Sequence, residues 1–145
     1  MPLVRITVRD DTSPDRQQAI SAGVHRAMVA TIGIPDGDRF QIIDRRPGDA
    51  LIADPEYLGA ARENVVFIEI TLVAGRTVEK KKALYAAVAK ELGAAGVRTD
   101  DVFVVLHETA REDWSFGNGE AQVLDTELLK RYGWTPPSDQ PRPAD

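Results

Sequence analysis

The sequence predicts an α/β (or α+β) fold in which two βαβ units form one four-stranded sheet with two helices on one face. Two observations predict it. First, an alternating apolar strand, a helical apolar stripe and a second apolar strand follow one another, and this order occurs twice. Second, the stripe of the first half recurs 64 positions later, as Ile20, Val24 and Met28 against Leu84, Val88 and Leu92. We interpret the series of matches as an internal duplication.

The first unit spans about residues 2–44. Val4, Ile6 and Val8 alternate with polar residues, which is typical of a half-buried strand. Ser13-Pro14-Asp15 then supplies an N-cap, a favourable first helical residue and an early acid, so a helix begins there. Gly33 and Pro35 end that helix, and residues 39–43 (RFQII) form the second strand.

The second unit, about residues 64–108, repeats this plan. Apolar residues alternate over 66–72, and Thr77 with Glu79 opens a helix that Gly93 and Gly96 are expected to close. The last strong strand is 102–106 (VFVVL). Asp38 before Phe40 corresponds to Asp101 before Phe103, here at an offset of 63.

Two such units leave one face of the sheet without helices. The strands of each βαβ unit should be parallel, with both helices on the same side. The other face should therefore pack against further copies of the chain, so we expect an oligomer. Residues 45–62 are expected to form a loop with a short helical turn, and 111–133 a C-terminal segment of the single domain 1–133. The Pro-rich stretch 134–145 is expected to be a mobile tail.

Composition excludes several classes of function. The net charge of −5 and the lack of a basic patch argue against nucleic acid or an anionic membrane as partner. The chain has no cysteine and only two histidines, so thiol catalysis and thiolate metal sites are excluded and no metal or cofactor is expected. No apolar run approaches the roughly 20 residues of a membrane span. We expect a cytoplasmic protein.

Pro2 is the first candidate for chemistry. Initiator methionine is generally removed before proline, which would leave a free secondary amine at the start of a strand. An α-amino group has a pKa of about 7.7–8.0, and burial or nearby charges can move it across neutral pH. Such an amine could act as a base or an acid without any histidine. The alternative is an ordinary proline with no role.

Two charged residues are further candidates. Arg76 lies in LVAGRTVEKKK, between a strand end and a helix start, where its planar fork could bind a carboxylate. Asp38 lies in IPDGDRFQ at a loop-to-strand junction. A solvated arginine and a turn carboxylate are the alternatives. Lys80, Lys81 and Lys82 are interpreted as a solvated helix face, and His25 and His107 as structural residues.

The stretch DWSFGNGEAQ, residues 113–122, displays two large aromatic side chains. Trp114 and Phe116 alternate in a loop closed by two glycines. Aromatic residues shown in this way usually dock on a core edge, a neighbouring subunit or a ligand.

Together, Pro2, the doubled βαβ pattern, Asp38, Arg76 in AGRT and DWSFGNGEAQ resemble the tautomerase superfamily, and within it the malonate semialdehyde decarboxylase group. The likeness runs from Pro2 to about Leu129. It implies a homotrimer of the tautomerase and macrophage migration inhibitory factor fold that needs no cofactor, with Pro2 at the floor of a pocket.

The resemblance also implies roles for site residues. Pro2 would transfer a proton, Asp38 would assist it and Arg76 would grip the carboxylate of a small substrate. The expected wall of the pocket consists of Trp114, Phe116, Val123 and Leu128. The decarboxylases carry two arginines at i and i+2, and here Ala74 replaces the first. In a strand-like segment, that spacing would aim both side chains at one face.

Three functions follow as hypotheses. The first is keto–enol tautomerisation of a small 2-oxo acid, which needs an amine, one carboxylate anchor and an apolar wall. The second is decarboxylation or hydration of a 3-oxo or acetylenic acid, which the replacement of the first arginine by Ala74 disfavours. The third is a non-catalytic trimeric binding domain.

Overall fold

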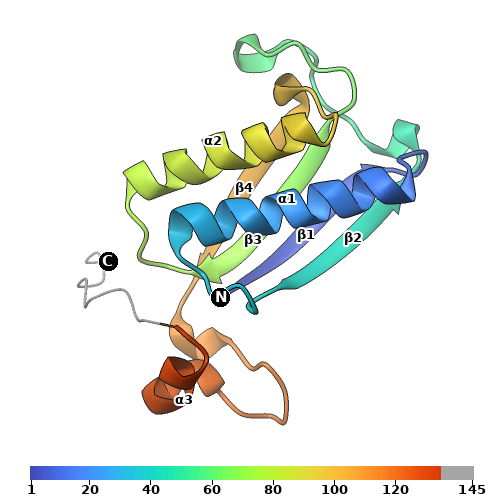
Figure 1. Cartoon of the computed structure of the whole chain (residues 1–145). Coiled ribbons are helices and arrows are strands. Elements are labelled where there is room, and N and C mark those ends of the chain that lie inside the picture. Colours follow the sequence, from blue (N-terminus) through green and yellow to red (C-terminus); the bar gives the residue numbers. More distant parts are fainter. Residues whose placement is uncertain (135–145) are drawn as a thin grey trace.

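The computed structural model describes residues 1–134, and its helices and strands follow the order expected for a duplicated βαβ chain (Figure 1). The elements are β1 (Pro2–Arg9), α1 (Pro14–Ile32), β2 (Phe40–Arg46), β3 (Val66–Val73), α2 (Val78–Ala94), β4 (Val102–Thr109) and α3 (Thr126–Arg131). Two short 3-10 turns, Gly48–Ala50 and Tyr57–Gly59, interrupt the long connection between β2 and β3.

The four strands form one sheet in the order β2-β1-β3-β4. β1 is parallel to β2 and β3 is parallel to β4, whereas the central pair β1 and β3 is antiparallel. Val4 pairs with Ile70, and Ile6 pairs with Ile68. The offset of 64 carries Val4 to Ile68 and Ile6 to Ile70, so each pair maps onto the other. The pairing register of β1 and β3 therefore follows the duplication. The predicted fold class is confirmed.

Both long helices begin at the predicted caps. Ser13 Oγ accepts a hydrogen bond from the backbone N–H of Arg16 at 3.2 Å, and Thr77 Oγ1 accepts one from Lys80 at 3.3 Å. These caps satisfy N–H groups that have no partner within the helix. The expected end of the second helix was partly wrong, because Gly93 lies inside α2. The chain turns only after it, at Gly96 with φ +86°.

The core lies between the helices and one face of the sheet, as Figure 1 shows. The six residues of the repeated stripe are each at most 1% exposed: Ile20, Val24, Met28, Leu84, Val88 and Leu92. The helix-facing strand residues Val4, Ile6, Ile68 and Ile70 are buried to the same degree. The repeat read from the sequence is therefore the repeat of the core.

The opposite face of the sheet carries large apolar side chains that the described residues leave open. Leu3 is 38% exposed, Ile42 39%, Phe103 45% and Phe40 47%. They alternate with the core residues along β1, β2 and β4, so the pleat directs them away from the helices. The expectation of a sheet face without helices is confirmed.

The C-terminal segment folds beyond the edge of the sheet and ends in α3 (Figure 1). Trp134, which the sequence interpretation placed in the tail, is only 7% exposed and packs in a small apolar cluster. The boundary of the tail at 134 was therefore wrong. Residues 135–145 lie outside the described residues. Within 1–134, no helix is long and apolar enough to cross a membrane.

Candidate active site

One edge of the sheet brings the predicted site residues together. β1 and β2 both begin there because they are parallel, and β3 ends there because it is antiparallel to β1. Pro2 at the start of β1 pairs with Leu72 near the end of β3. Asp38 precedes β2 and Arg76 follows β3. The topology thus explains why residues far apart in the sequence meet.

A buried ion pair marks this edge. The α-amino group of Met1 lies 3.2 Å from Asp38 Oδ2, and both side chains are nearly buried, at 7% and 11% exposure. Asp38 Oδ2 makes no hydrogen bond of regular geometry with the described residues. The ion pair with the chain terminus is therefore the interaction that compensates the burial of this oxygen.

Burial lowers the pKa of this amino group below its usual value of 8.0. The carboxylate of Asp38 opposes the shift, because its negative charge favours the ammonium form. The positive charge of Arg76 acts in the same direction as burial. Burial at this edge therefore makes the Met1 amine easier to deprotonate. The carboxylate of Asp38 lies beside the amine and stabilises its protonated form.

Arg76 lies between the end of β3 and the cap residue Thr77. Its Nη1 donates a hydrogen bond to the backbone oxygen of Val73 at 2.6 Å. Burial lowers the pKa of the guanidinium, and the charges of Glu108 and Asp38 oppose that shift. Among the described residues, the bond to Val73 is the only hydrogen bond of this side chain. The remaining N–H donors are thus available to a carboxylate.

Apolar side chains surround the chain terminus. Met1 packs in a buried cluster with Val123, Leu129 and Trp134, and Trp114 and Phe116 pack against this cluster. The rings of Trp114 and Phe116 are stacked, with centroids 5.6 Å apart. The Met1 side chain, at 6% exposure, occupies the space that these residues enclose.

Hydrogen bonds hold the aromatic loop on the sheet. Trp114 Nε1 donates to Thr109 Oγ1 at 2.6 Å, and Thr109 Oγ1 donates to the backbone oxygen of Leu72 at 3.2 Å. The backbone N–H of Phe116 donates to Gln122 Oε1 at 2.9 Å, which closes the loop. The wall is therefore tied to the same strand end that pairs with Pro2.

The candidates differ in where the structure places them. Pro2, Asp38, Arg76, Trp114, Phe116 and Val123 gather at this edge or in its apolar cluster. Leu128 is half-buried outside that cluster, and its backbone N–H donates to Asp125. Its neighbour Leu129 packs in the cluster instead.

Sequence reasoning missed several residues of the site. Besides Leu129 and Trp134, these are Thr109, which anchors Trp114, and Arg111. Arg111 donates to the backbone oxygen of Val123 at 3.1 Å, and its guanidinium lies 5.1 Å from the centre of the Trp134 ring. The cap at Asp125 marks the start of α3, but it does not distinguish Leu129 from Leu128, since both lie about one turn later.

The expected strand geometry around Ala74 is wrong. β3 ends at Val73, Ala74 lies exposed in a bend, and Gly75 has φ +128°. The backbone between Ala74 and Arg76 is therefore not extended, so the two positions need not face the same side.

Two other predicted assignments concern histidine and metal. His25 is buried, and its Nε2 donates to the backbone oxygen of Asp36 at 2.8 Å, which fits a structural residue. Over residues 1–134, no group of three or more His, Cys, Asp or Glu side chains could hold a metal ion.

The doubled βαβ fold and this edge define a class, the small α/β enzymes of the tautomerase superfamily. Two family models, each described as a tautomerase enzyme, match residues 2–61 and 38–117, so the chain belongs to the tautomerase family. It is 39% identical over 127 residues to Probable tautomerase YusQ of Bacillus subtilis (strain 168), covering 86% of this chain and all of that protein. Probable tautomerase YrdN of the same organism is 32% identical over 130 residues, covering 88% and 100%.

Comparison with solved structures supports the same family assignment. FG41 malonate semialdehyde decarboxylase inhibited by 3-bromopropiolate is 40% identical, with a TM-score of 0.82 over 86% of this chain and 96% of that one. Another malonate semialdehyde decarboxylase is 28% identical, with a TM-score of 0.80 over 86% and 98%. A fused 4-OT symmetric trimer is 27% identical, with a TM-score of 0.70 over 83% and 97%.

Proposed function

We propose that the protein is a cofactor-independent tautomerase that moves a proton between the keto and enol forms of a small 2-oxo acid. The observation that carries this proposal is the pair formed by the chain-terminal amine and the buried Asp38, 3.2 Å apart, beside Arg76. In the active form Met1 is removed, and the secondary amine of Pro2 becomes the chain terminus.

Removal of Met1 would create the substrate cavity. The Met1 side chain fills the space among Val123, Leu129 and Trp134, with Trp114 and Phe116 beside it. Its loss would leave an apolar cavity with the Pro2 nitrogen at one end. A cavity with few polar groups suits the carbon chain of a small acid, while the polar groups orient it.

The chemistry requires three contributions. Arg76 would bind the substrate carboxylate with its unused N–H donors. The neutral amine of Pro2 would accept the proton of the enol hydroxyl and deliver a proton to carbon 3, which leaves the amine unchanged overall. Burial lowers the pKa of the Met1 amine, and a Pro2 amine in the same surroundings would favour its neutral form in the same way, while Asp38 would stabilise the ammonium formed in between.

Decarboxylation or hydration of a 3-oxo acid is the second candidate. The 40% identity to a malonate semialdehyde decarboxylase favours it. The absence of an arginine at Ala74 argues against it, because cleavage of a C–C bond demands closer positioning of the carboxylate than proton transfer does. A non-catalytic binding domain is the third candidate, and it would be favoured by a native chain that keeps Met1 in the pocket.

The proposal includes a homotrimer. Its support is the exposed apolar face of the sheet and the trimer formed by the fused 4-OT relative. A small carboxylate-bearing molecule as substrate and a cytoplasmic location belong to the same proposal.

Replacement of Pro2 tests the proposal. Intact mass should first show loss of Met1 from the wild type. Pro2→Ala should then lower turnover of enol-pyruvates by about 100-fold or more, the lower range for a positioned proton-transfer group. Pro47→Ala, which removes a proline from the loop before Gly48–Ala50, is the control and should retain activity. Unchanged turnover in Pro2→Ala would remove Pro2 from the mechanism.

A further inference from the structure

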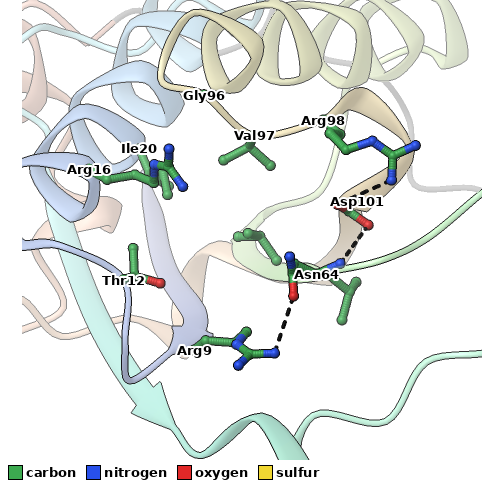
Figure 2. A pocket seen from close by; sticks show the side chains of 11 residues that line it. Arg9, Thr12, Arg16, Ile20, Asn64, Gly96, Val97, Arg98 and Asp101 are labelled. Atoms are coloured by element: carbon green, nitrogen blue, oxygen red, sulfur yellow. Dashed lines mark hydrogen bonds and ion pairs between the residues drawn. The ribbon is translucent and has the colours of Figure 1, made fainter.

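The duplication relates the edge around Pro2 to a second place in the molecule. An offset of 64 carries Met1 and Pro2 to Val65 and Val66, and an offset of 63 carries Asp38 to Asp101. Val65, Val66 and Asp101 line one pocket of about 160 Å³, at the end of β1 rather than at its start (Figure 2). The molecule therefore contains a counterpart of its candidate active site.

The counterpart lacks the groups for proton transfer. Val65 and Val66 lie within the chain, so no α-amino group is present there. Asp101 is 2% exposed, and its Oδ1 accepts the backbone N–H groups of Glu63 at 2.7 Å and Asn64 at 3.1 Å. Asp38 thus faces an amine at the first site, whereas its counterpart Asp101 accepts backbone hydrogen bonds at the second.

The second pocket has arginines instead. Arg9 from the end of β1, Arg16 from the first turn of α1 and Arg98 line it, and Figure 2 shows Arg9 directed toward Asn64 and the guanidinium of Arg98 beside Asp101. Asp101 is the only carboxylate among its lining residues, and just outside the lining Asp11 pairs with Arg9, while Glu63 and Asp100 pair with Arg98. Thr12, the counterpart of Arg76, contributes a hydroxyl group.

Two of the three arginines already have partners. Arg9 binds both carboxylate oxygens of Asp11 and the side-chain oxygen of Asn64, all at 3.2 Å. Arg98 donates to the backbone oxygen of Ala61 at 3.0 Å and forms an ion pair with Glu63 at 3.2 Å.

Arg16 differs from them. Within residues 1–134, its guanidinium has no hydrogen bond or ion pair. It lies directly against Gly96, where an added Cβ would come within 2.9 Å of Nη2. Gly96 also has φ +86°, which disfavours any side chain, so no Cβ occupies the space beside the arginine. Arg16 is exposed, so its planar fork of donors lies at the pocket with no protein acceptor among the described residues.

We propose that this pocket is a second, non-catalytic site that binds a small oxyanion, the carboxylate or phosphate group of a ligand, through Arg16. Thr12 donates its hydroxyl group, whereas Arg9 and Arg98 keep their carboxylate partners Asp11 and Glu63. Arg is the residue best suited to such groups because its fork matches two oxygens at once. The site is independent of proton transfer at Pro2.

An NMR titration of the ¹⁵N-labelled full chain tests this site. Inorganic phosphate and acetate are added in separate series, and the backbone amides of Thr12, Asn64 and Gly96 are followed. Saturable shifts at these amides with either anion are expected, and the anion that produces them identifies the preferred group. Arg16→Gln should weaken that binding about tenfold or more, as expected for loss of a charge-assisted hydrogen bond.

Lys82→Gln is the matched control. Lys82 is an exposed helical cation near the start of α2, away from the pocket lining, and its replacement changes the net charge equally. It should leave the titration unchanged. The proposal is overturned if neither anion shifts the three amides, or if the two variants weaken binding equally. Pro2→Ala should leave binding intact, so failure of the tautomerase proposal and failure of this one are separable.

Discussion

Asp38 and Asp101 show how one position of a duplicated chain acquires two roles. Each precedes an outer strand of the sheet, yet Asp38 faces the chain terminus and Asp101 accepts two backbone N–H groups. The difference arises because only the first unit begins with a free amine. At the scale of residues, the equivalent carboxylates of the two units therefore have different partners, which a repeat alone does not reveal.

Replacement of Arg76 should weaken substrate binding and turnover. If it is the carboxylate anchor, Arg76→Ala should lower kcat/KM for a 2-oxo acid by roughly 10- to 150-fold, corresponding to about 1.5–3 kcal/mol for a charge-assisted hydrogen bond. Arg76→Lys should recover only part, because a point charge lacks the planar fork. Steady-state kinetics of the three proteins measures this, and equal kcat/KM in all three would contradict an anchoring role.

Replacement of Asp38 should change the pH dependence. Asp38 raises the pKa of the terminal amine against the effect of burial. Its loss in Asp38→Asn leaves burial and Arg76 unopposed, so the pKa falls and the amine deprotonates at lower pH. The inflection of kcat/KM that reports this amine should therefore move to lower pH.

Asp36→Asn is the control for this pH profile. The Asp36 side chain is 97% exposed, and its replacement makes the same change of charge nearby. Its profile should coincide with that of the wild type. A shift to higher pH in Asp38→Asn would contradict the role given to Asp38.

Most residues of the candidate site were recognisable at this scale, although their roles stay predictions, and the one misplaced wall residue has a physical cause. Pro2, Asp38, Arg76 and Trp114 are recognisable by residue type beside strand ends. The choice of Leu129 over Leu128 depends on the rotation of the six-residue helix α3, which is too short to show a periodic pattern.

At the scale of elements, local signals predicted where helices begin better than where they end. Ser13 and Thr77 are caps in the sequence and in the structure. Gly93 was misread because a glycine inside a helix costs only about 1 kcal/mol, which the packing of Leu92 into the core can offset. The left-handed turn requires Gly96, not Gly93.

The bend after β3 leads to a prediction for Ala74→Arg. Because Ala74 is exposed and the backbone between it and Arg76 is bent, strand geometry does not place an arginine here on the same face as Arg76. Exposed charge pairs contribute about 0–1 kcal/mol, so malonate semialdehyde decarboxylation should change by at most about fivefold relative to the wild type. Product formation by the two proteins measures this. A much larger gain would show that the new side chain reaches the pocket despite the bend.

At the scale of the whole molecule, the duplication explains both the fold and its incompleteness. Two βαβ units supply two long helices, and these cover one face of a four-stranded sheet. The sequence predicted this face to be open because its pattern provides no third layer. The repeat by itself does not distinguish the two related edges; the candidate site was placed at the first edge from Pro2, whose counterpart is Val66, and from the C-terminal segment, which lies outside the repeat.

The open face leads to the last prediction, a homotrimer. Light scattering should give about three times the chain mass of 15.9 kDa.

Phe103 contacts Phe67 edge to face at 5.2 Å and is 45% exposed on this face. Phe103→Glu would place a carboxylate in an apolar interface, where an unpaired charge is strongly unfavourable, so the trimer should dissociate. Tyr132→Glu, at an aromatic residue that is 74% exposed outside the sheet, should leave the mass unchanged. A monomeric wild type at micromolar concentration would contradict the trimer, and with it the reason why this face carries so many apolar side chains.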